Sequence, residues 1–175
     1  LRMKAAGICG SDLHWGYRRS REEASDLVEK RGKIIPGHEP AGVIEEVGEG
    51  VENLEVGDRV MVYHAAGCGH CPDCLDGYQM YCKKAWVLGS NVHGGFADLM
   101  LARAIGCLKL PDELSLEDGA IGACAGGTAY QILRDLEITA RDDAAFYGLG
   151  PLGLAAVLVA KAMGARVIGI DIVEE

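Results

Sequence analysis

The sequence of 175 residues lacks the features that mark several classes of protein. Its most basic stretch is YRRSR at 17–21 and its formal net charge is −9, so it offers no cationic face to nucleic acid. No apolar run approaches the ~18 residues needed to cross a membrane, because Lys161 interrupts AAVLVAKAM. No basic and then apolar leader opens the chain, which starts LRMKAAGICGSD without an initiator Met. We therefore expect no nucleic-acid or membrane partner, and an N-terminal segment that is missing.

The composition is that of a globular protein with unusual glycine and cysteine contents. Hydrophobic residues make up 49% and charged residues 25%, which is ordinary. The 25 glycines are about twice the usual share and follow no collagen-like period, which indicates tight turns and close backbone approaches. The seven cysteines are an odd number without signs of secretion. Clustered cysteines in such a chain bind metal or do chemistry more often than they pair, so we expect a cytoplasmic protein.

The hydrophobic pattern divides the chain into a β-rich first part and an α/β second part. Four β-branched or apolar runs predict short strands, at 41–51, 56–63, 94–102 and 105–111. Ser115 with Asp118 three residues later is typical of a helix start, and residues 127–136 have helical apolar spacing. Residues 142–171 read as a strand, a glycine turn, a helix and a strand, which is one βαβ unit. We place the boundary near Cys124–Ala125.

The stretch CGHCPDCLDGYQMYC places four cysteines in the spacing C-x2-C-x2-C-x7-C. Disulfides fit poorly, because cysteines two residues apart rarely reach disulfide geometry. A ferredoxin-type cluster normally has its fourth cysteine after three residues and a proline next, whereas here the gap is seven and Lys83 follows. Short loops with this spacing can deliver adjacent thiolates to one zinc ion, although His70 could compete as a ligand. We predict a structural zinc site at Cys68, Cys71, Cys74 and Cys82.

Two further motifs, GICGSDLH at 7–14 and GHEPAGVIEEVGEGV at 37–51, carry a resemblance. With the four-cysteine spacing, they are similar to the signature of the zinc-dependent medium-chain alcohol dehydrogenases, and the similarity covers nearly the whole chain. It implies a GroES-like β-barrel catalytic domain at 1–124, followed by the first half of a Rossmann dinucleotide-binding domain at 125–175. Because a dinucleotide fold has two βαβαβ halves, we expect a fragment of a chain about twice as long.

The resemblance also implies a catalytic zinc site. Its three protein ligands are Cys9, His38 and Cys124, which leave the fourth position open as a Lewis-acid zinc requires. Glu39 is the acidic residue close to the metal and ligates transiently. Cys124 has alternatives, since polyol relatives use a carboxylate there and a cysteine can be a small buried apolar residue. We interpret Cys107 in this second way.

Ser11 and His14 follow Cys9 closely and resemble a proton relay. In the family the hydroxyl accepts a hydrogen bond from the alcohol, and the proton passes through the cofactor ribose to the histidine. His64 and His93 have no motif support, so a loop histidine is the default interpretation of both. The charged segment 15–35 is either a short helix over the active-site mouth or a surface insertion.

GLGPLG at 148–153 is a G-x-G-x-x-G in the context that a dinucleotide fingerprint demands, after an apolar strand and at a helix start. Asp171, 21 residues after Gly150, is expected to accept from the adenosine ribose and to favour NAD over NADP. Thr128 resembles a family threonine against the nicotinamide, or is a helix N-terminal hydroxyl. The expected contacts of the loop with the cofactor are made by Gly148, Gly150, Pro151, Leu152 and Gly153.

Together these features predict reversible transfer of a hydride between an alcohol or polyol and NAD, giving an aldehyde or ketone. The full-length protein is expected to bind two zinc ions and to form a homodimer or homotetramer. Three alternatives stay open: a zinc-stabilised module without catalysis, a truncated and inactive dehydrogenase, and a quinone-reductase-like relative without catalytic zinc. The presence of Cys9, His38 and Cys124 together argues against the last.

Overall fold

The computed structural model describes residues 1–16 and 34–173, with only the backbone of residues 14–16. The charged segment 15–35 falls mainly on residues 17–33, so both predictions for it lie outside the described residues. Two compact units divide the chain, Leu1–Ala123 and Cys124–Glu175. Each is described by itself.

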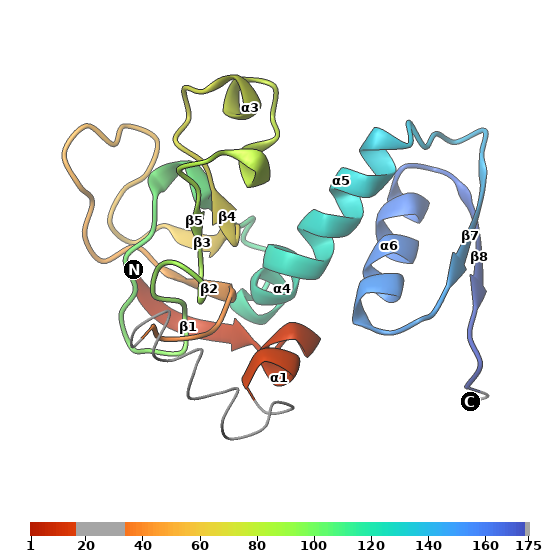
Figure 1. Cartoon of the computed structure of the whole chain (residues 1–175), viewed down its shortest axis with the longest axis horizontal. Coiled ribbons are helices and arrows are strands. Elements are labelled where there is room, and N and C mark those ends of the chain that lie inside the picture. Colours follow the sequence, from red (N-terminus) through yellow and green to blue (C-terminus); the bar gives the residue numbers. More distant parts are fainter. Residues whose placement is uncertain (17–33, 174–175) are drawn as a thin grey trace. The chain divides into compact units, whose positions relative to one another are not determined.

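A four-stranded antiparallel sheet is the frame of the first unit (Figure 1). Its order is β1-β2-β3-β6, and each neighbouring pair is antiparallel. Strand β3 and the first four residues of β1 alternate more buried residues with more exposed ones, as expected of a sheet with one face on a core. Strand β2 is buried almost throughout, and β6 has one buried residue, Cys107. The strands are β1 (Arg2–Gly7), β2 (Glu39–Val43), β3 (Arg59–Val62) and β6 (Cys107–Lys109).

Close backbone contact between β1 and β2 depends on a glycine. A Cβ atom on Gly42 would lie 2.3 Å from the carbonyl oxygen of Arg2, nearer than atoms can approach. The register shifts between Met3 and Ala5, so β1 is irregular at this point. After the shift Gly7 lies opposite Glu39, which brings the end of β1 beside the start of β2.

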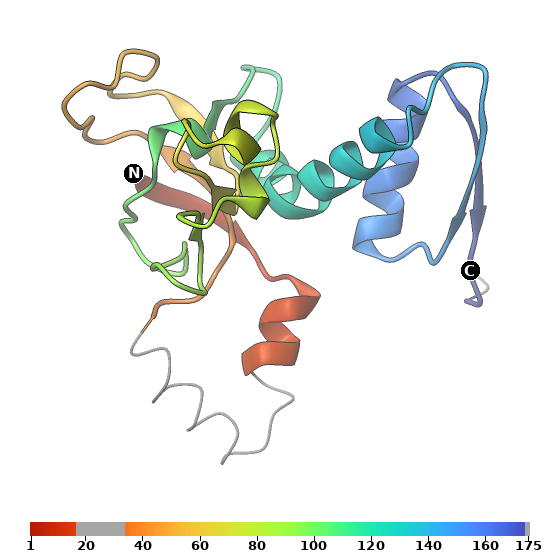
Figure 2. The same cartoon turned by 45° about the horizontal axis from the view of Figure 1, so that its top comes forward.

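Helices and a small second sheet complete the first unit. Helix α1 (Gly10–Gly16) follows directly from the end of β1 (Figure 2), and α4 (Leu116–Ile121) packs on β1, β2 and β3. Strands β4 (Ala65–Ala66) and β5 (Trp86–Val87) form a two-stranded antiparallel ladder. The loop between them carries the short helix α3 (Pro72–Leu75) and the 3₁₀ turn η1 (Gln79–Tyr81), and another 3₁₀ turn, η2 (Ala104–Gly106), precedes β6.

The apolar core of the first unit lies on the sheet. It gathers Val60 and Val62 of β3 with Ile44, Leu54, Leu88, Met100 and Cys107. Cys107 is 9% exposed, and burial raises the pKa of its thiol to about 11, which agrees with its interpretation as a core residue.

The prediction of a helix start at Ser115 is confirmed: Ser115 Oγ accepts the Asp118 N–H, and the Asp118 carboxylate accepts the Ser115 N–H.

The predicted strand at 94–102 is wrong as a regular element. Within it only Leu99 pairs as a bridge, with Arg2, and no strand is assigned there. Its backbone nevertheless bonds to the start of the chain, where Met3 N–H donates to Asp98 O and Met100 N–H to Leu1 O. The two glycines at its start allow close contacts instead: a Cβ on Gly94 would lie 2.1 Å from Gly37 O, and one on Gly95 would lie 2.7 Å from the Cβ of Pro40. The strands at 56–63 and 105–111 are present but shorter than predicted.

The second unit contains the predicted βαβ element. Parallel strands β7 (Asp143–Tyr147) and β8 (Arg166–Ile170) flank α6 (Pro151–Ala162), and α5 (Gly127–Asp135) packs on α6. Leu133, Ala160 and Ala165 form its small core. A π-helical segment, Gly122–Gly126, precedes α5 and contains the boundary between the units. Among the helices described, none has the length and apolar character that crossing a membrane requires.

Candidate functional site

The four cysteines at 68–82 converge on one point. Their four Sγ atoms all lie within 4.8 Å of one another, and Cys68 Sγ is 4.0 Å from Cys74 Sγ. No disulfide joins the cysteines that the structure describes. Four sulfurs at this separation fit the tetrahedral ligand set of zinc, so the donor chemistry of the loop suits the predicted metal.

Local turns give the loop its shape. Gly69 and Gly77 have φ of 84° and 87°, a left-handed conformation that glycine adopts at low cost. Cys71 is the residue just before α3, whose first position is Pro72, and Cys82 directly follows the turn η1. Cys71 and Cys82 therefore stand at the ends of short helical turns and Cys74 lies within one, so the chain changes direction often enough for residues close in sequence to share one centre.

Two thiols of this loop have pKa values shifted in opposite directions. The backbone N–H of His70 is the main cause that lowers the pKa of Cys68 to about 6. The backbone N–H of Cys74 lowers the pKa of Cys71, but desolvation and hydrogen bonds to the other three thiols outweigh it and raise that pKa to about 12. His70 itself is turned to the backbone, with Nδ1 3.0 Å from Cys68 O. It is not one of the residues whose ligand atoms converge.

A second cluster forms where β1 ends and β2 begins. The ligand atoms of Cys9, His38 and Glu39 lie within 4.8 Å of one another. Glu39 is 8% exposed and is a buried charged residue of the described chain, whereas Cys9 and His38 are half-buried. The pairing of Gly7 with Glu39 brings these residues together from 29 positions apart, as counted from Cys9 to His38. One sulfur, one imidazole and one carboxylate are donors that a catalytic zinc accepts.

Asp12 holds this cluster together, and the sequence analysis missed it. Its Oδ1 lies 3.1 Å from His38 Nδ1, and its Oδ2 accepts the Cys9 N–H at 2.9 Å. Both side chains are well covered, with 15% of His38 and 10% of Asp12 exposed. When Nδ1 donates to Asp12, the lone pair of Nε2 is available, and Ser11 Oγ lies 3.3 Å from it. A carboxylate that orients a ligand histidine in this way is typical of metal sites.

A signal for Asp12 was present in the sequence. Cys9 immediately precedes α1, and Asp12 is the third residue of the helix. An acidic side chain at this position commonly reaches back to the N–H of the cap residue, as half of a capping box does. Because Cys9 and not Ser or Thr stands at the cap, the full capping-box pattern that located Ser115 and Asp118 is absent here, and only its acidic half pointed to Asp12.

His64 lies close to the second cluster, although no motif pointed to it. Its Nδ1–H donates to Ala123 O at 3.3 Å, its ring centroid is 5.9 Å from that of His38, and burial lowers its pKa. His64 is therefore more closely associated with the cluster than a loop histidine. His93 Nδ1 accepts the Ile35 N–H at 3.0 Å and so supports the segment before His38. His14 lies in α1, and Cys124 is the first residue of the second unit; their predicted roles stay predictions.

The glycine loop of the second unit connects β7 to α6. Gly148 has φ of 89°, and a Cβ on Gly153 would lie 1.8 Å from Gly148 O, so both positions require glycine. A Cβ on Gly150 would meet nothing within 4 Å, which leaves open space at the N-terminus of α6. Pro151 is the first helical residue and Leu152 is 48% exposed. The first N–H groups of an α-helix have no partner within the helix, which makes such a helix start suited to an anion.

Asp171 follows β8 and contacts the glycine loop. Its carboxylate accepts the N–H of Leu149, and also those of Ile172 at 2.7 Å and Val173 at 3.1 Å. The Leu149 amide is the main cause that lowers the pKa of Asp171, followed by the other two amides. The acidic residue and the glycine turn are thus adjacent in space. Thr128 is the second residue of α5, and its predicted contact with a nicotinamide stays a prediction.

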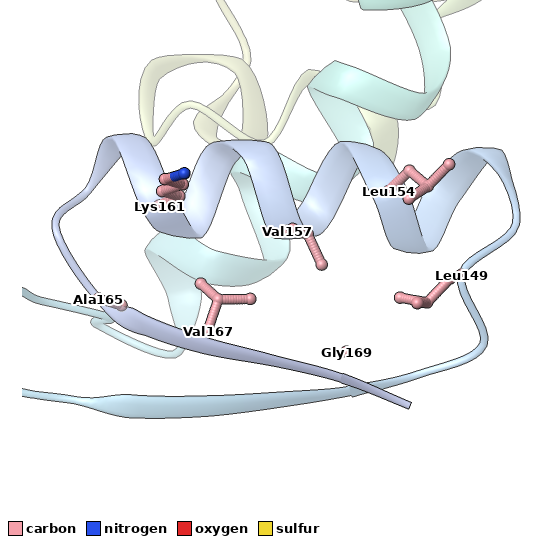
Figure 3. A pocket seen from close by; sticks show the side chains of 7 residues that line it. All are labelled: Leu149, Leu154, Val157, Lys161, Ala165, Val167 and Gly169. Carbon is pink, nitrogen blue, oxygen red and sulfur yellow. The ribbon is translucent and has the colours of Figure 1, made fainter. Parts of the chain in front are cut away.

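A cavity of about 330 Å³ lies between α6 and β8 (Figure 3). Leu149 and Leu154 line one end, and Lys161 and Ala165 line the other. Its seven lining residues are apolar except Lys161, and they include neither Gly150 nor Asp171. The cavity is therefore distinct from the open space at the helix start, and we assign no ligand to it.

Comparison with known proteins agrees with the motifs. Residues 1–112 match the family model of the alcohol dehydrogenase GroES-like domain. The whole chain is 42% identical to an uncharacterized zinc-type alcohol dehydrogenase-like protein, YphC, of Escherichia coli K12 and to an alcohol dehydrogenase of Geobacillus stearothermophilus. It covers 51% and 50% of these proteins, so the chain spans about half the length of the curated relatives it matches.

Solved structures give the same result. An alcohol dehydrogenase from the archaeon Aeropyrum pernix is similar with a TM-score of 0.78 and 35% identity, over 98% of this chain and 51% of that one. Galactitol-1-phosphate dehydrogenase from Escherichia coli is similar with a TM-score of 0.74 and 32% identity, over 99% of this chain and 48% of that one. The chain therefore belongs to the zinc-type medium-chain alcohol dehydrogenase family, with a GroES-like domain in its first part.

Proposed function

We propose that the protein to which this chain belongs is a zinc-dependent oxidoreductase that transfers a hydride between an alcohol or polyol and NAD. The observation that carries the proposal is the cluster of Cys9, His38 and Glu39, with Asp12 orienting the histidine, in a chain of this family. A structural metal site alone would not need a second set of donors beside a helix start.

Two zinc sites belong to the proposal. The four cysteines of the loop at 68–82 hold a structural zinc, and their converging sulfurs support this. Cys9, His38 and Cys124 hold a catalytic zinc, with Glu39 as a transient ligand. Bound zinc would supply Lewis-acid chemistry that favours loss of the hydroxyl proton of the alcohol.

The residues around the second cluster have proposed roles in binding and proton transfer. Asp12 keeps the His38 ring turned so that Nε2 faces the donor cluster, as its 3.1 Å contact with Nδ1 supports. Ser11 Oγ, which lies 3.3 Å from that nitrogen, is close enough to accept the hydrogen bond of an alcohol held at the same place. His14 would pass the proton on towards solvent.

The proposal for the cofactor concerns residues 125–175, interpreted as the first half of a Rossmann domain that follows a catalytic domain at 1–124. The open space at Gly150 and the free amides at the start of α6 support a pyrophosphate site there. Asp171 beside the glycine loop would accept from the ribose and disfavour a 2′-phosphate, so NAD is the expected cofactor. The proposed cofactor contacts are Gly148, Gly150, Pro151, Leu152, Gly153 and Thr128.

The substrate class follows from the relatives. A sorbitol dehydrogenase of Arabidopsis thaliana is 38% identical over 99% of this chain and 47% of its own length, and other relatives are alcohol dehydrogenases. We therefore propose a small alcohol or polyol as substrate, oxidised to an aldehyde or ketone. We further propose that the full-length protein forms a homodimer or homotetramer. We also propose a cytoplasmic location, because seven cysteines without disulfides suit a reducing compartment.

The alternative of a zinc-stabilised module without catalysis is separated by metal analysis. The proposed dehydrogenase binds two zinc ions per chain, whereas a module needs only the four-cysteine site. After dialysis of the full-length protein against zinc, one ion per chain would contradict the proposal, and two ions would support it. An NAD-linked screen of alcohols and polyols on that protein then tests the reaction. We expect residues 1–175 alone to bind zinc but to turn over poorly or not at all.

A further inference from the structure

The loop that carries the four cysteines is closed at its base by one arginine outside it. Arg103 Nη1 donates to Gly67 O at 2.9 Å and to Lys84 O at 2.8 Å, with a longer contact of 3.3 Å to Ala66 O. Gly67 immediately precedes the first cysteine, and Lys84 follows the last cysteine by two residues. A single guanidinium therefore joins the segment that enters the loop to the segment that leaves it.

The remainder of Arg103 is fixed as well. Its guanidinium carbon lies 4.7 Å from the ring centroid of Trp86, the first residue of β5, in a cation–π arrangement. Its carbonyl accepts the Gly106 N–H at 2.9 Å, and the Sγ–H of the buried Cys107 at 3.5 Å. The side chain therefore extends from the core of the first unit to the loop base, with both of its ends held.

The β4–β5 ladder alone is a weak closure. It has two residue pairs, Ala65 with Val87 and Ala66 with Trp86, and isolated two-stranded ladders are marginal in water. Within the loop, Gln79 Oε1 accepts the Gly67 N–H at 3.0 Å, so the segment that enters the loop is also bonded to a residue of the loop itself. Charge-assisted hydrogen bonds from a planar guanidinium are stronger than those between neutral groups. They are the contacts best suited to keep the loop ends together before a metal binds.

We infer that Arg103 is the positioning residue of the four-cysteine metal site: by joining the entry and exit segments it preorganises the thiols and raises the metal affinity. This inference rests on the proposed metal binding of the loop. Loop ends that are already closed lose less conformational freedom on binding, so part of the ordering cost is met before the metal arrives.

The test is a titration of the full 175-residue chain with Co²⁺, followed through the thiolate-to-cobalt absorption of a tetrathiolate centre, in competition with a chelator. Four proteins are compared: the unsubstituted chain, Arg103→Met, Arg103→Lys and the control Arg141→Met. Loss of a group that supports metal ligands typically costs ~10–100-fold in metal affinity, and we expect about that for Arg103→Met. Arg103→Lys should be intermediate, since an ammonium keeps the charge without the planar fork. The exposed Arg141 should be replaceable without effect.

A second measurement separates positioning from general loss of structure. In metal-free protein, amide hydrogen exchange of the Leu75 and Ala85 N–H groups reports whether the loop stays closed. We expect faster exchange at these amides in Arg103→Met, with unchanged exchange in β2 and β3. If Arg103→Met fails to fold by circular dichroism, the lysine variant decides the matter.

The outcomes distinguish the inference from the proposed function. An unsubstituted chain without a tetrathiolate spectrum would overturn the proposed metal site and this inference with it. A normal spectrum in which Arg103→Met and the unsubstituted chain bind cobalt equally would overturn the inference alone. Lowered affinity with partial rescue by lysine would support it.

Discussion

The two donor clusters of the first unit are built in different ways. The four-cysteine loop takes every ligand from fifteen residues, and its turns, caps and glycines are local. Cys9 and His38 instead come from separate segments that the β1–β2 pairing joins. The first cluster therefore depends on the conformation of one loop, whereas the second depends on the register of a sheet. The two sites should respond to different substitutions.

The largest effect is expected from loss of a thiolate within the loop. Cys74→Ser replaces one of the four converging sulfurs by a weaker zinc ligand. Structural zinc contributes about 10–16 kcal/mol in small zinc domains, so one of four ligands corresponds to about 3 kcal/mol, or a loss of zinc affinity of about a hundredfold. Equilibrium dialysis with metal analysis measures this change. Cys107→Ala, which removes a core cysteine, should retain the metal, and equal zinc affinity in both variants would contradict the assignment.

A substitution in the sheet should instead affect the second cluster. Gly42→Ala would place a Cβ 2.3 Å from Arg2 O, so β1 must move away from β2. We expect destabilisation by about 1–3 kcal/mol in urea unfolding, and weaker metal binding at Cys9 and His38 with an intact four-cysteine site.

The matched control for this substitution is Gly48→Ala. A Cβ on Gly48 meets nothing within 4 Å, so stability should change by less than about 0.5 kcal/mol. If Gly42→Ala removed metal from the four-cysteine loop as readily as from the second cluster, the two sites would not be independent.

A smaller and more local effect is expected from Asp12→Asn. The amide keeps the size of the side chain but weakens the acceptor that orients His38 and holds the Cys9 N–H. Loss of such a partner typically lowers metal affinity ~10–100-fold, and we expect this at the Cys9 and His38 cluster only. Site-resolved cobalt spectra measure it. Asp76→Asn, an exposed acid within the four-cysteine loop, should leave both spectra unchanged, and a similar loss in that variant would argue against a specific role of Asp12.

The same contrast explains what the sequence could predict. The four-cysteine loop is local, so spacing and glycine positions were sufficient to locate a loop whose sulfurs do converge. The βαβ unit could likewise be predicted. The changes in hydrophobic periodicity between strand and helix, and the glycine turn that separates them, all lie within about thirty residues. The pairing of Cys9 with His38 needed the resemblance, since nothing in either segment specifies that β1 lies beside β2.

Contacts made by long side chains between distant segments were not predictable from pattern. Nothing in the sequence around Arg103 indicates a special role for this residue. Its hydrogen bonds to Gly67 O and Lys84 O depend on where the folded core places residue 103. The error at 94–102 has a related cause. Its apolar residues suggested a strand, but Gly94 lies in close contact with residues 36–37 and Gly95 with Pro40, and only Leu99 pairs with β1 as a bridge.

The smallest expected effect concerns an ion pair in the sheet that assembles the second cluster. Asp58 and Lys109 join the start of β3 to β6, with Nζ 2.7 Å from Oδ2. The Lys109 ammonium is the main cause that lowers the pKa of Asp58, and the Asp58 carboxylate is the main cause that raises the pKa of Lys109.

The direction of the pH dependence follows from these two shifts. A lowered carboxyl pKa gives a stabilisation that is present above the unfolded value of about 3.9 and is lost as pH falls through the folded pKa. A raised ammonium pKa gives a stabilisation that is present below about 10.4 and is lost as pH rises through the folded pKa. Asp58→Asn should therefore unfold at a lower urea concentration than the unsubstituted chain between about pH 4 and 10, and the difference between the two proteins should shrink below about pH 3. The control Asp112→Asn, whose fully exposed carboxylate lies 3.9 Å from Arg59, should change little. Because neither β4 nor β5 belongs to this sheet, zinc affinity of the four-cysteine loop should be the same in both variants, and a shared loss would contradict the independence of the two clusters.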